Sequence, residues 1–125
     1  MDVDPLRYAQ RMAVAAAVER RRGACCQVEV ALAPERAAAA AALLKALADP
    51  MRLSILATLG RTRDPVCVCD FTASYALSQP TISHHMARLR AAGLVQAHKH
   101  GIWTYYRLAD PLPPVAASVL DALGG

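Results

Sequence analysis

The segment "SQPTISHHMARLRAAGLV", residues 78–95, decides the fold of this chain. Ser78 can cap a helix there, Pro80 is tolerated in its first turn, and Gly93 ends it. A shorter helix, over residues 70–75, precedes it across a tight turn. Two helices joined in this way have the spacing of a helix-turn-helix.

The longer helix, predicted over residues 79–92, has an apolar side made of Ile82, Met86 and Leu89. The polar residues on the other side or along its edges are Gln79, Thr81, Ser83, His84, His85 and Arg88. Hydrogen-bonding side chains in the first half of such a helix suit the major groove of DNA. A helix surface that only faces water more often carries Glu and Lys, so we predict that these polar residues read DNA.

A second interpretation of His84 and His85 is that they bind a metal ion. Adjacent residues of a helix point about 100° apart, however, so the two rings cannot face one ion. We therefore favour DNA reading for both histidines.

Two strands are predicted next, over residues 94–97 and 102–108, with a turn between them that contains Lys99. This hairpin would form the wing of a winged helix-turn-helix. We expect Lys99 to meet DNA phosphates or the minor groove, and His98 and His100 are placed to do the same. The residues expected to pack the hairpin onto the helices are Trp103, Tyr105 and Tyr106.

Three more helices are predicted toward the N-terminus. The first covers residues 5–22 and the second begins at Pro34. The third follows Asp49, its N-cap, and ends at Gly60. A last helix after Pro114 carries an apolar stripe, which suggests burial against a partner and consists of Val115, Val119, Leu120 and Leu123. The predicted fold class is mostly α (α+β), with a two-stranded β-wing.

We expect two parts in the chain. Residues 1–33 hold an N-terminal helix and a cysteine-bearing segment, and residues 34–125 hold the winged helix-turn-helix for DNA binding and dimerisation. The formal charge of +4 favours a polyanionic partner. No run of about 18 apolar residues occurs, and the first residues lack the features of a secretion signal. We therefore expect a cytoplasmic protein with no membrane partner.

In the cytoplasm the four cysteines are expected to stay reduced, which favours metal binding or redox sensing over structural disulfides. Two of them lie in "CVCD", residues 67–70. In a regular helix Cys67 and Cys69 would project about 200° apart, whereas in an extended segment they would point to the same side. One ion can be held by both only if this stretch is extended or distorted. If the first turn stays helical, Cys69 should face inward while Cys67 faces the ion.

Four segments together resemble the ArsR/SmtB family of metal-responsive winged helix-turn-helix repressors: "LLKALADPMRLSILATL", "CVCD", "SQPTISHHMARLRAAGLV" and "GIWTYYRL". The similarity covers about residues 35–123, and the arsenic-sensing branch is the most similar. What the resemblance implies is a homodimer that pairs through its first and last helices. Such a dimer binds an inverted-repeat operator without metal and releases it when a thiophilic ion binds.

The sequence departs from one arsenic-sensing pattern of that family, in which a third cysteine lies five residues after the first, because Thr72 stands there. A hydroxyl replaces a thiolate poorly toward soft ions, so the missing ligand must come from Cys25 or Cys26. The predicted composite site, formed between subunits, consists of Cys25, Cys26, Cys67 and, when four thiolates bind, Cys69. Three thiolates suit As(III) or Sb(III), and four suit Cd(II), Pb(II) or Zn(II).

Other interpretations stay open. In a redox switch, a strained and easily reduced disulfide between Cys67 and Cys69, or between Cys25 and Cys26, would release DNA. An interaction module would use the last helix without binding DNA. An enzyme is disfavoured, because the sequence has neither a βαβ pattern nor a phosphate-binding Gly loop. No His follows His100, which excludes the zinc site that some family members build on the last helix.

Overall fold

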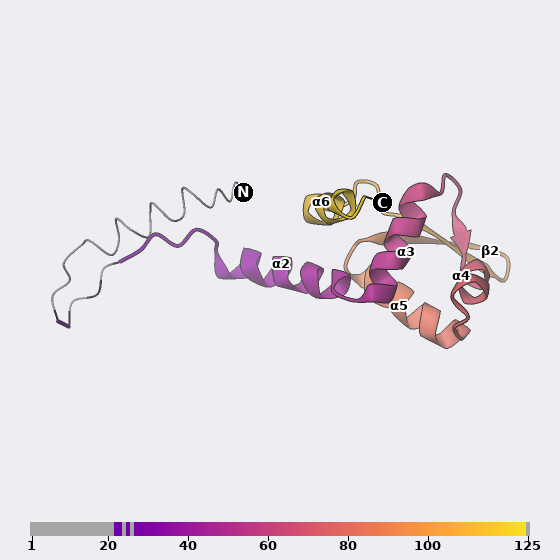
Figure 1. The fold of residues 1–125 in the computed structure, drawn as a ribbon, viewed down its shortest axis with the longest axis horizontal. Helices are drawn as coiled ribbons and strands as arrows, with labels where there is room; N and C mark the ends of the chain where they lie inside the picture. Colours follow the sequence, from indigo (N-terminus) through magenta and orange to yellow (C-terminus); the bar gives the residue numbers. More distant parts are fainter. Residues whose placement is uncertain (1–21, 24, 26, 125) are drawn as a thin grey trace. The chain divides into compact units, whose positions relative to one another are not determined.

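The structure is a computed structural model that describes residues 22–23, 25 and 27–124 (Figure 1). The chain forms two compact units, Met1–Ala31 and Leu32–Gly125, and each is treated by itself. Apart from its last residue, the helix predicted over residues 5–22 lies outside the described residues, and so does Cys26. The second unit contains the helix-turn-helix and the wing.

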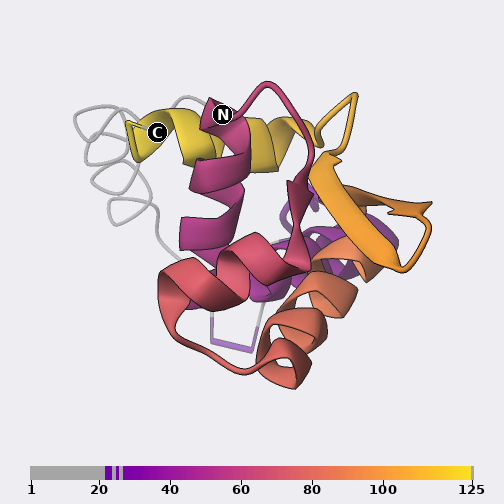
Figure 2. The ribbon, with the colours of Figure 1, turned by 90° about the vertical axis from the view of Figure 1, so that its right-hand side faces the viewer.

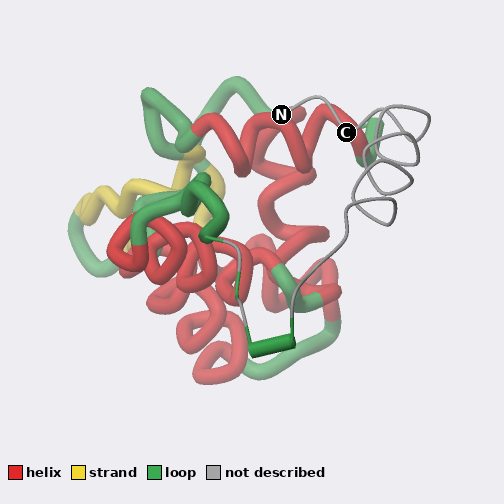
Figure 3. The backbone as a smooth tube through the Cα atoms, turned by 90° about the vertical axis from the view of Figure 1, so that its left-hand side faces the viewer, coloured by secondary structure: helices red, strands yellow, loops and turns green. Residues whose placement is uncertain are grey.

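Helices dominate the second unit, and a small antiparallel sheet lies at one side of them (Figures 2 and 3). In chain order the elements are α2 (Pro34–Leu47), α3 (Pro50–Arg61), β1 (Val66–Cys67), α4 (Val68–Tyr75), α5 (Gln79–Ala91), β2 (Val95–His100), β3 (Trp103–Leu108) and α6 (Pro114–Ala122). The strand order in the sheet is β1-β3-β2. This architecture is a winged helix-turn-helix, which confirms the predicted fold class.

The helix starts follow the predicted local signals. The Asp49 carboxylate accepts a hydrogen bond from the backbone N–H of Arg52 at 2.9 Å and so caps α3. In α5, the Ser78 hydroxyl accepts from the backbone N–H of Thr81 at 3.4 Å. A proline occupies the first turn of both helices, where its missing N–H leaves no hydrogen bond unmade.

The core lies between α3, α4, α5 and the start of β2. Ile82, Met86 and Leu89 of α5 are completely buried, as their helical spacing predicted. The other core side chains with at most 4% of their surface exposed are Leu47, Ile55, Leu56, Leu59, Phe71, Leu94, Val95 and Ala116. Each fully buried Leu or Ile contributes roughly 1.5–3 kcal/mol to stability. Burial of the apolar side therefore fixes the rotation of α5 about its axis and turns its polar side toward solvent.

Some predicted element boundaries were wrong, and one strand was not predicted. The third helix does not end at Gly60, whose backbone stays helical beside Leu108, and it continues to Arg61. The wing turn is confined to Gly101 and Ile102, because β2 extends to His100 through pairing with β3. The sheet also has a third strand, β1, since the short segment before α4 pairs with the edge of β3.

The prediction for the wing aromatics holds only in part. Tyr106 packs against the core and Tyr105 is half-buried, but Trp103 keeps 48% of its surface exposed. Trp103 is the first residue of β3, next to the tight turn, and it does not belong to the core cluster. Its side chain instead lines a cleft with residues of α4 and α5.

The first and last helices of the second unit expose much apolar surface. In α2 only Leu47 is buried, and Leu44 is 47% exposed. In α6, Ala116 is buried. Of the predicted stripe, Val115 is 43% exposed and Leu123, the C-cap residue after the helix, is 57% exposed. None of the helices among the described residues combines the length and the apolar character needed to cross a bilayer.

Candidate thiol site and DNA-reading surface

Cys67 lies at the junction of a strand and a helix. It is the last residue of β1, where its Cα pairs with that of Tyr105, and its backbone is extended, with φ −73° and ψ 148°. It is also the N-cap of α4. Its N–H donates to the Asp70 carboxylate at 3.1 Å, and its Sγ accepts from the Asp70 N–H, which completes a capping box. The extended backbone that a shared ion would require is thus present at Cys67.

The exposure of the two thiols is the reverse of the prediction. Cys67 is 5% exposed, whereas Cys69 is exposed to solvent. The prediction assumed that both residues were helical, but α4 begins only at Val68. Cys67 therefore leaves the edge of the sheet toward the interior, and Cys69, in the first turn, faces outward.

Cys67 and Cys69 nevertheless line the same cleft and influence each other. A hydrogen bond with the Cys67 side chain is the main cause that raises the pKa of the Cys69 thiol above its ordinary value, and desolvation raises it further. The neighbouring charges of Cys67 and Asp70 act in the same direction. The pair is thus placed to bind one atom through two sulfurs, with the Cys69 sulfur kept protonated at neutral pH.

The two thiols open onto a cleft of about 310 Å³, which we call the thiol cleft. It lies where the start of α4, the first half of α5 and the tip of the wing meet. Its lining includes Cys67, Cys69, Gln79, Ser83, Trp103 and Thr104. The cysteine pair and two predicted DNA-reading residues therefore share one cavity, which the sequence spacing alone did not indicate.

Neither of the other predicted thiol ligands belongs to the described part of the second unit, and Cys26 lies outside the described residues. Cys25 is exposed and belongs to the first unit. Across residues 22–23, 25 and 27–124, no cluster of three or more Cys, His, Asp or Glu side chains is arranged to hold a metal ion. Thr72, at the position of the absent third cysteine, donates its hydroxyl to the Cys69 carbonyl at 2.8 Å. The composite site stays a prediction.

The polar side of α5 faces solvent as a group. Gln79, Thr81, His84 and Arg88 are exposed, and Ser83 is half-buried at the edge of the thiol cleft. The Thr81 hydroxyl lies 2.9 Å from that of Ser78, so it takes part in the cap of the helix. These side chains are placed where a recognition helix presents its groups to a major groove.

His85 has a different setting from the other polar residues of α5. Its ring is half-buried, with Nδ1 3.5 Å from Nη1 of Arg52 and 3.8 Å from the Asp49 carboxylate. Arg52 in turn donates from Nε to the Ala46 carbonyl at 2.6 Å and from Nη2 to the Lys45 carbonyl at 3.2 Å. His85 thus joins a group that ties α5 to the start of α3 and the end of α2.

Two cations near this polar group, Lys45 and Arg52, were not singled out by the sequence pattern. With Arg88, which was predicted to read DNA, they line a hollow of about 340 Å³ between α2, α3 and α5. Lys45 and Arg52 come from two different helices, so no local motif marks them. Clustered Lys and Arg side chains next to a recognition helix suit DNA phosphates.

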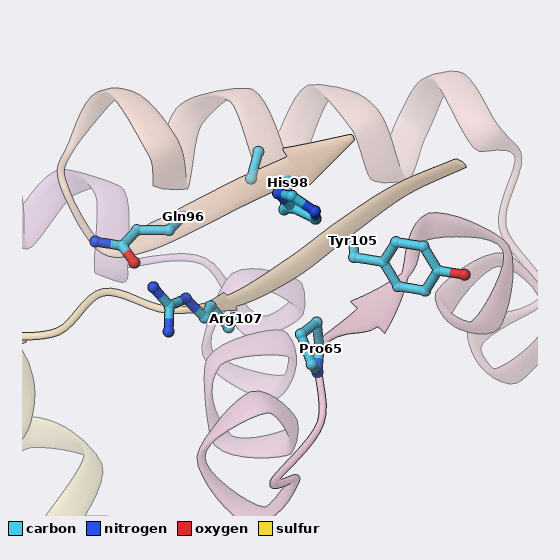
Figure 4. A pocket seen from close by; sticks show the side chains of 6 residues that line it. Pro65, Gln96, His98, Tyr105 and Arg107 are labelled. Carbon is cyan, nitrogen blue, oxygen red and sulfur yellow. The ribbon is translucent and has the colours of Figure 1, made fainter. Parts of the chain in front are cut away.

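The wing separates its polar residues onto two faces. Gln96 and Arg107 lie opposite each other on β2 and β3, and with His98, Tyr105 and Pro65 they line a hollow of about 480 Å³ (Figure 4). Side chains alternate along a strand, so Lys99 points to the other face. Lys99, His98 and His100 are all exposed near the tip, where a wing can approach DNA.

Comparison with known proteins shows the family of this chain. Residues 49–97 match the family described as "Bacterial regulatory protein, arsR family". The arsenical resistance operon repressor of Escherichia coli is 43% identical over 79 residues, which are 63% of this chain and 67% of that protein.

Solved structures agree with this assignment. HlyU from Vibrio cholerae superposes with a TM-score of 0.61 at 31% identity and covers 73% of this chain and 94% of its own. A homodimeric winged helix-turn-helix DNA-binding domain from Mycobacterium bovis superposes with a TM-score of 0.59 at 26% identity. The match covers 77% of this chain and 87% of that domain. These proteins are transcription regulators, not enzymes. The chain belongs to the ArsR/SmtB family and is a transcriptional repressor with a winged helix-turn-helix.

Proposed function

We propose that this repressor holds operator DNA in its metal-free form and releases it when As(III) binds cysteine thiolates, with Sb(III) as a second inducer. The single observation that carries the proposal is the thiol cleft, in which Cys67 and Cys69 lie beside Gln79 and Ser83 of the recognition helix. A similar protein from Escherichia coli is named an arsenical resistance operon repressor. Acting on DNA, the protein would work in the cytoplasm.

The inducer site that we propose is composite. The thiol cleft supplies Cys67 and Cys69, and Cys25 and Cys26 of the partner subunit supply the remaining thiolates. Three thiols displace the three hydroxyl groups of arsenous acid as water and form three As–S bonds. Pyramidal As(III) and Sb(III) suit three soft sulfur ligands.

Binding is coupled to DNA through the first turn of α4. A sulfur bonded to As(III) accepts hydrogen bonds less well, so the capping box between Cys67 and Asp70 is weakened when the ion binds. Because α4 packs on α5, a shift of the stretch between Pro65 and Asp70 tilts the recognition helix. For nearly complete switching, the ion must bind the released state more favourably than the DNA-bound state by about 5.5 kcal/mol. Structural Zn²⁺ sites built from several such ligands supply about 10–16 kcal/mol.

DNA binding rests on α5 and the wing. We propose that Gln79, Thr81, Ser83, His84 and Arg88 contact bases or nearby phosphates, and that Lys99 of the wing contacts the backbone. His85 supports this surface through Asp49 and Arg52, in addition to any contact that it makes with DNA.

The operator would be an inverted repeat read by a homodimer. Two-fold symmetry in the protein is matched by two-fold symmetry in the site. A similar domain from Mycobacterium bovis is homodimeric. In this chain α6 leaves Val115 and Leu123 exposed, and a dimer that pairs the first and last helices would cover them.

A specific observation also favours a second candidate. Because Cys69 is exposed and lines the thiol cleft with Cys67, it is placed to add a fourth thiolate to the composite site, which would make the protein a Cd(II), Pb(II) or Zn(II) sensor. The same proximity would allow a redox switch. Thiol titration with and without peroxide distinguishes that switch from ion binding.

The test is a fluorescence-anisotropy titration of reduced protein on an inverted-repeat operator. As(III), Cd(II) and Zn(II) are added in turn to the wild type, to Cys67→Ser and to a Cys25→Ser, Cys26→Ser double variant. We expect As(III) to release wild-type protein and neither variant. Release of the double variant by As(III) would contradict the composite site, and no release of the wild type by any ion would favour redox sensing.

A further inference from the structure

We propose that the hollow on the outer face of the wing is a binding site for an aromatic carboxylate, a small organic anion with a planar ring system. The hollow has a volume of about 480 Å³, and its lining consists of Pro65, Gln96, Ala97, His98, Tyr105 and Arg107 (Figure 4). This inference goes beyond the proposed function, because the site needs neither the cysteine thiols nor operator DNA. It would give the repressor a second small-molecule ligand.

The charge of the hollow favours an anion. Arg107 supplies a guanidinium group, and none of the residues that line the hollow is acidic. Among the described residues, no carboxylate forms an ion pair with Arg107. Its side chain is exposed, so its N–H donors are open to a ligand. A planar guanidinium pairs with a carboxylate through two parallel hydrogen bonds, which fix the position of the anion.

Gln96 adds a second polar group at the same end of the hollow. Its Cα pairs with that of Arg107 across β2 and β3, so both side chains leave the same face of the sheet. Figure 4 shows these two side chains together at one end of the hollow. A carboxylate has about four acceptor positions, so the amide of Gln96 can donate to it beside the guanidinium of Arg107.

The other end of the hollow suits a ring. Tyr105 is half-buried there, and its Cα pairs with that of His98 on the same face. Pro65, the residue before β1, also lines the hollow (Figure 4). Aromatic rings gain from offset or edge-on contacts with other rings. Ligand pockets typically have volumes of roughly 300–1,000 Å³ and combine aromatic walls with a few polar groups, and this hollow has both features.

The sheet separates this hollow from the recognition helix. Side chains alternate along a strand, so the neighbours of Gln96 and Arg107 point to the other face. Two of those neighbours, Val95 and Leu108, belong to the core or pack against it, on the side where α5 contacts β2. We therefore expect the hollow to stay open to solvent when α5 lies in a major groove.

The experiment is a calorimetric titration of the whole chain with 2-naphthoate, in the presence and absence of operator DNA. We expect one naphthoate to bind per subunit, with the same affinity for the free protein and for the operator complex. Two probes separate the ends of the hollow. 2-Naphthamide keeps the rings without the charge, and acetate keeps the charge without the rings, so each should bind about tenfold more weakly.

Three results would overturn the proposal. The first is that naphthoate does not bind, and the second is that naphthamide or acetate binds as tightly as naphthoate does. The third is that naphthoate binds the free protein but not the operator complex, because the hollow would then be part of the DNA interface.

Substitutions on the two faces of the wing provide a matched comparison. Arg107→Gln should weaken naphthoate binding about tenfold, because the charge-assisted hydrogen bonds are lost. Lys99→Gln removes a cation from the other face and should leave this binding unchanged. Circular dichroism checks that both variants are folded. Equal affinities of the two variants for naphthoate would contradict the role of Arg107.

The ring end is tested at Tyr105. Tyr105→Phe keeps the ring and should bind naphthoate as the wild type does. Tyr105→Thr removes the ring but keeps a residue that favours strands, and it should weaken the binding of naphthoate while leaving that of acetate unchanged. An unchanged affinity of Tyr105→Thr for naphthoate would contradict the aromatic wall.

A Cys67→Ser variant separates this inference from the proposed function. It should bind naphthoate as tightly as the wild type does, because no thiol lines the hollow. If arsenite releases the wild type from the operator but naphthoate does not bind, the inference fails and the proposed function stands. If naphthoate binds but arsenite does not release the operator, the inference stands and the proposed function fails.

Discussion

Cys67, the N-cap of α4, and Ser83, in the first half of the recognition helix, line the same cleft. A ligand on the sulfur therefore needs no long path to reach the DNA-reading surface. The two functions can still be tested separately, because Ser83 has no sulfur to bind an ion and Cys67 exposes only 5% of its surface.

Ser83→Ala should weaken operator binding about tenfold, the size expected when one good contact to a base is lost. The number of As(III) ions bound per dimer should not change, because Ser83 supplies no thiolate. Anisotropy measures the first quantity and thiol-binding stoichiometry the second. Ser74→Ala, on the exposed surface of α4, is the matched control. If both Ser83→Ala and His84→Ala bind the operator normally, the recognition surface has been misassigned.

Two substitutions of Cys67 should separate its sensing role from its structural role. Serine is a preferred N-cap, so Cys67→Ser should keep the stability of α4 within a few tenths of a kcal/mol while the response to As(III) is lost. Cys67→Ala removes the cap as well and should cost about 1 kcal/mol in the free energy of unfolding. Urea denaturation gives the stabilities. Equal stability of the alanine and serine variants would show that the capping box contributes little.

The raised pKa of Cys69 predicts different pH dependences for different ions. Cd(II) displaces the proton of each protonated thiol that it binds, so its apparent affinity should rise roughly tenfold per pH unit for each proton released. Because the pKa of Cys69 is raised, the apparent affinity for Cd(II) should continue to increase up to a higher pH than it would with an ordinary thiol. Neutral arsenous acid takes up the thiol protons as water, so its affinity should change little.

The measurement is the concentration of each ion that releases the operator, determined between about pH 6 and pH 8. A steep pH dependence for arsenite would mean that the thiols bind from a deprotonated state, contrary to the raised pKa of Cys69.

Asp49 should stabilise α3 through its cap and through its charge. Asp49→Ala should lower the free energy of unfolding by about 1 kcal/mol, whereas Asp49→Asn should keep most of the cap. The pKa of Asp49 is lowered, mainly by the hydrogen bond from the Arg52 backbone, so its contribution is complete above the ordinary carboxyl pKa of 3.8. That contribution should be lost as the pH falls from there through the lowered value.

Unfolding of wild type and Asp49→Asn across this acidic range provides the check, since asparagine does not titrate. A stability difference that stays constant down to the lowest pH would contradict the titration of Asp49.

The exposed apolar residues of α6 should matter for the oligomeric state. Leu123→Gln should shift the protein toward monomer in sedimentation, because it places an amide in the interface that we propose. Ile102→Gln, at the exposed wing tip, changes a comparable apolar residue and should leave the dimer intact. Equal sedimentation of both variants and the wild type would place the interface elsewhere.

Local signals in the sequence were sufficient for most of the fold. Asp49 and Ser78 cap helices through hydrogen bonds to residues three positions away, and Ile82, Met86 and Leu89 form a buried side through helical spacing. These features depend on neighbours in the chain, so a pattern of types and spacings determines them. The cysteine motif likewise marked the candidate thiol site by composition alone.

Only the tertiary structure decided how that site is arranged. The two-residue strand β1 exists because β3, far along the chain, offers it a pairing edge, and this pairing keeps Cys67 extended and outside α4. That long-range pairing buries Cys67 and leaves Cys69 exposed. It also places both thiols in the cleft that Ser83 lines. The link from His85 to Arg52 likewise joins two helices. No local period encodes such contacts, because they depend on which surfaces meet when the chain packs.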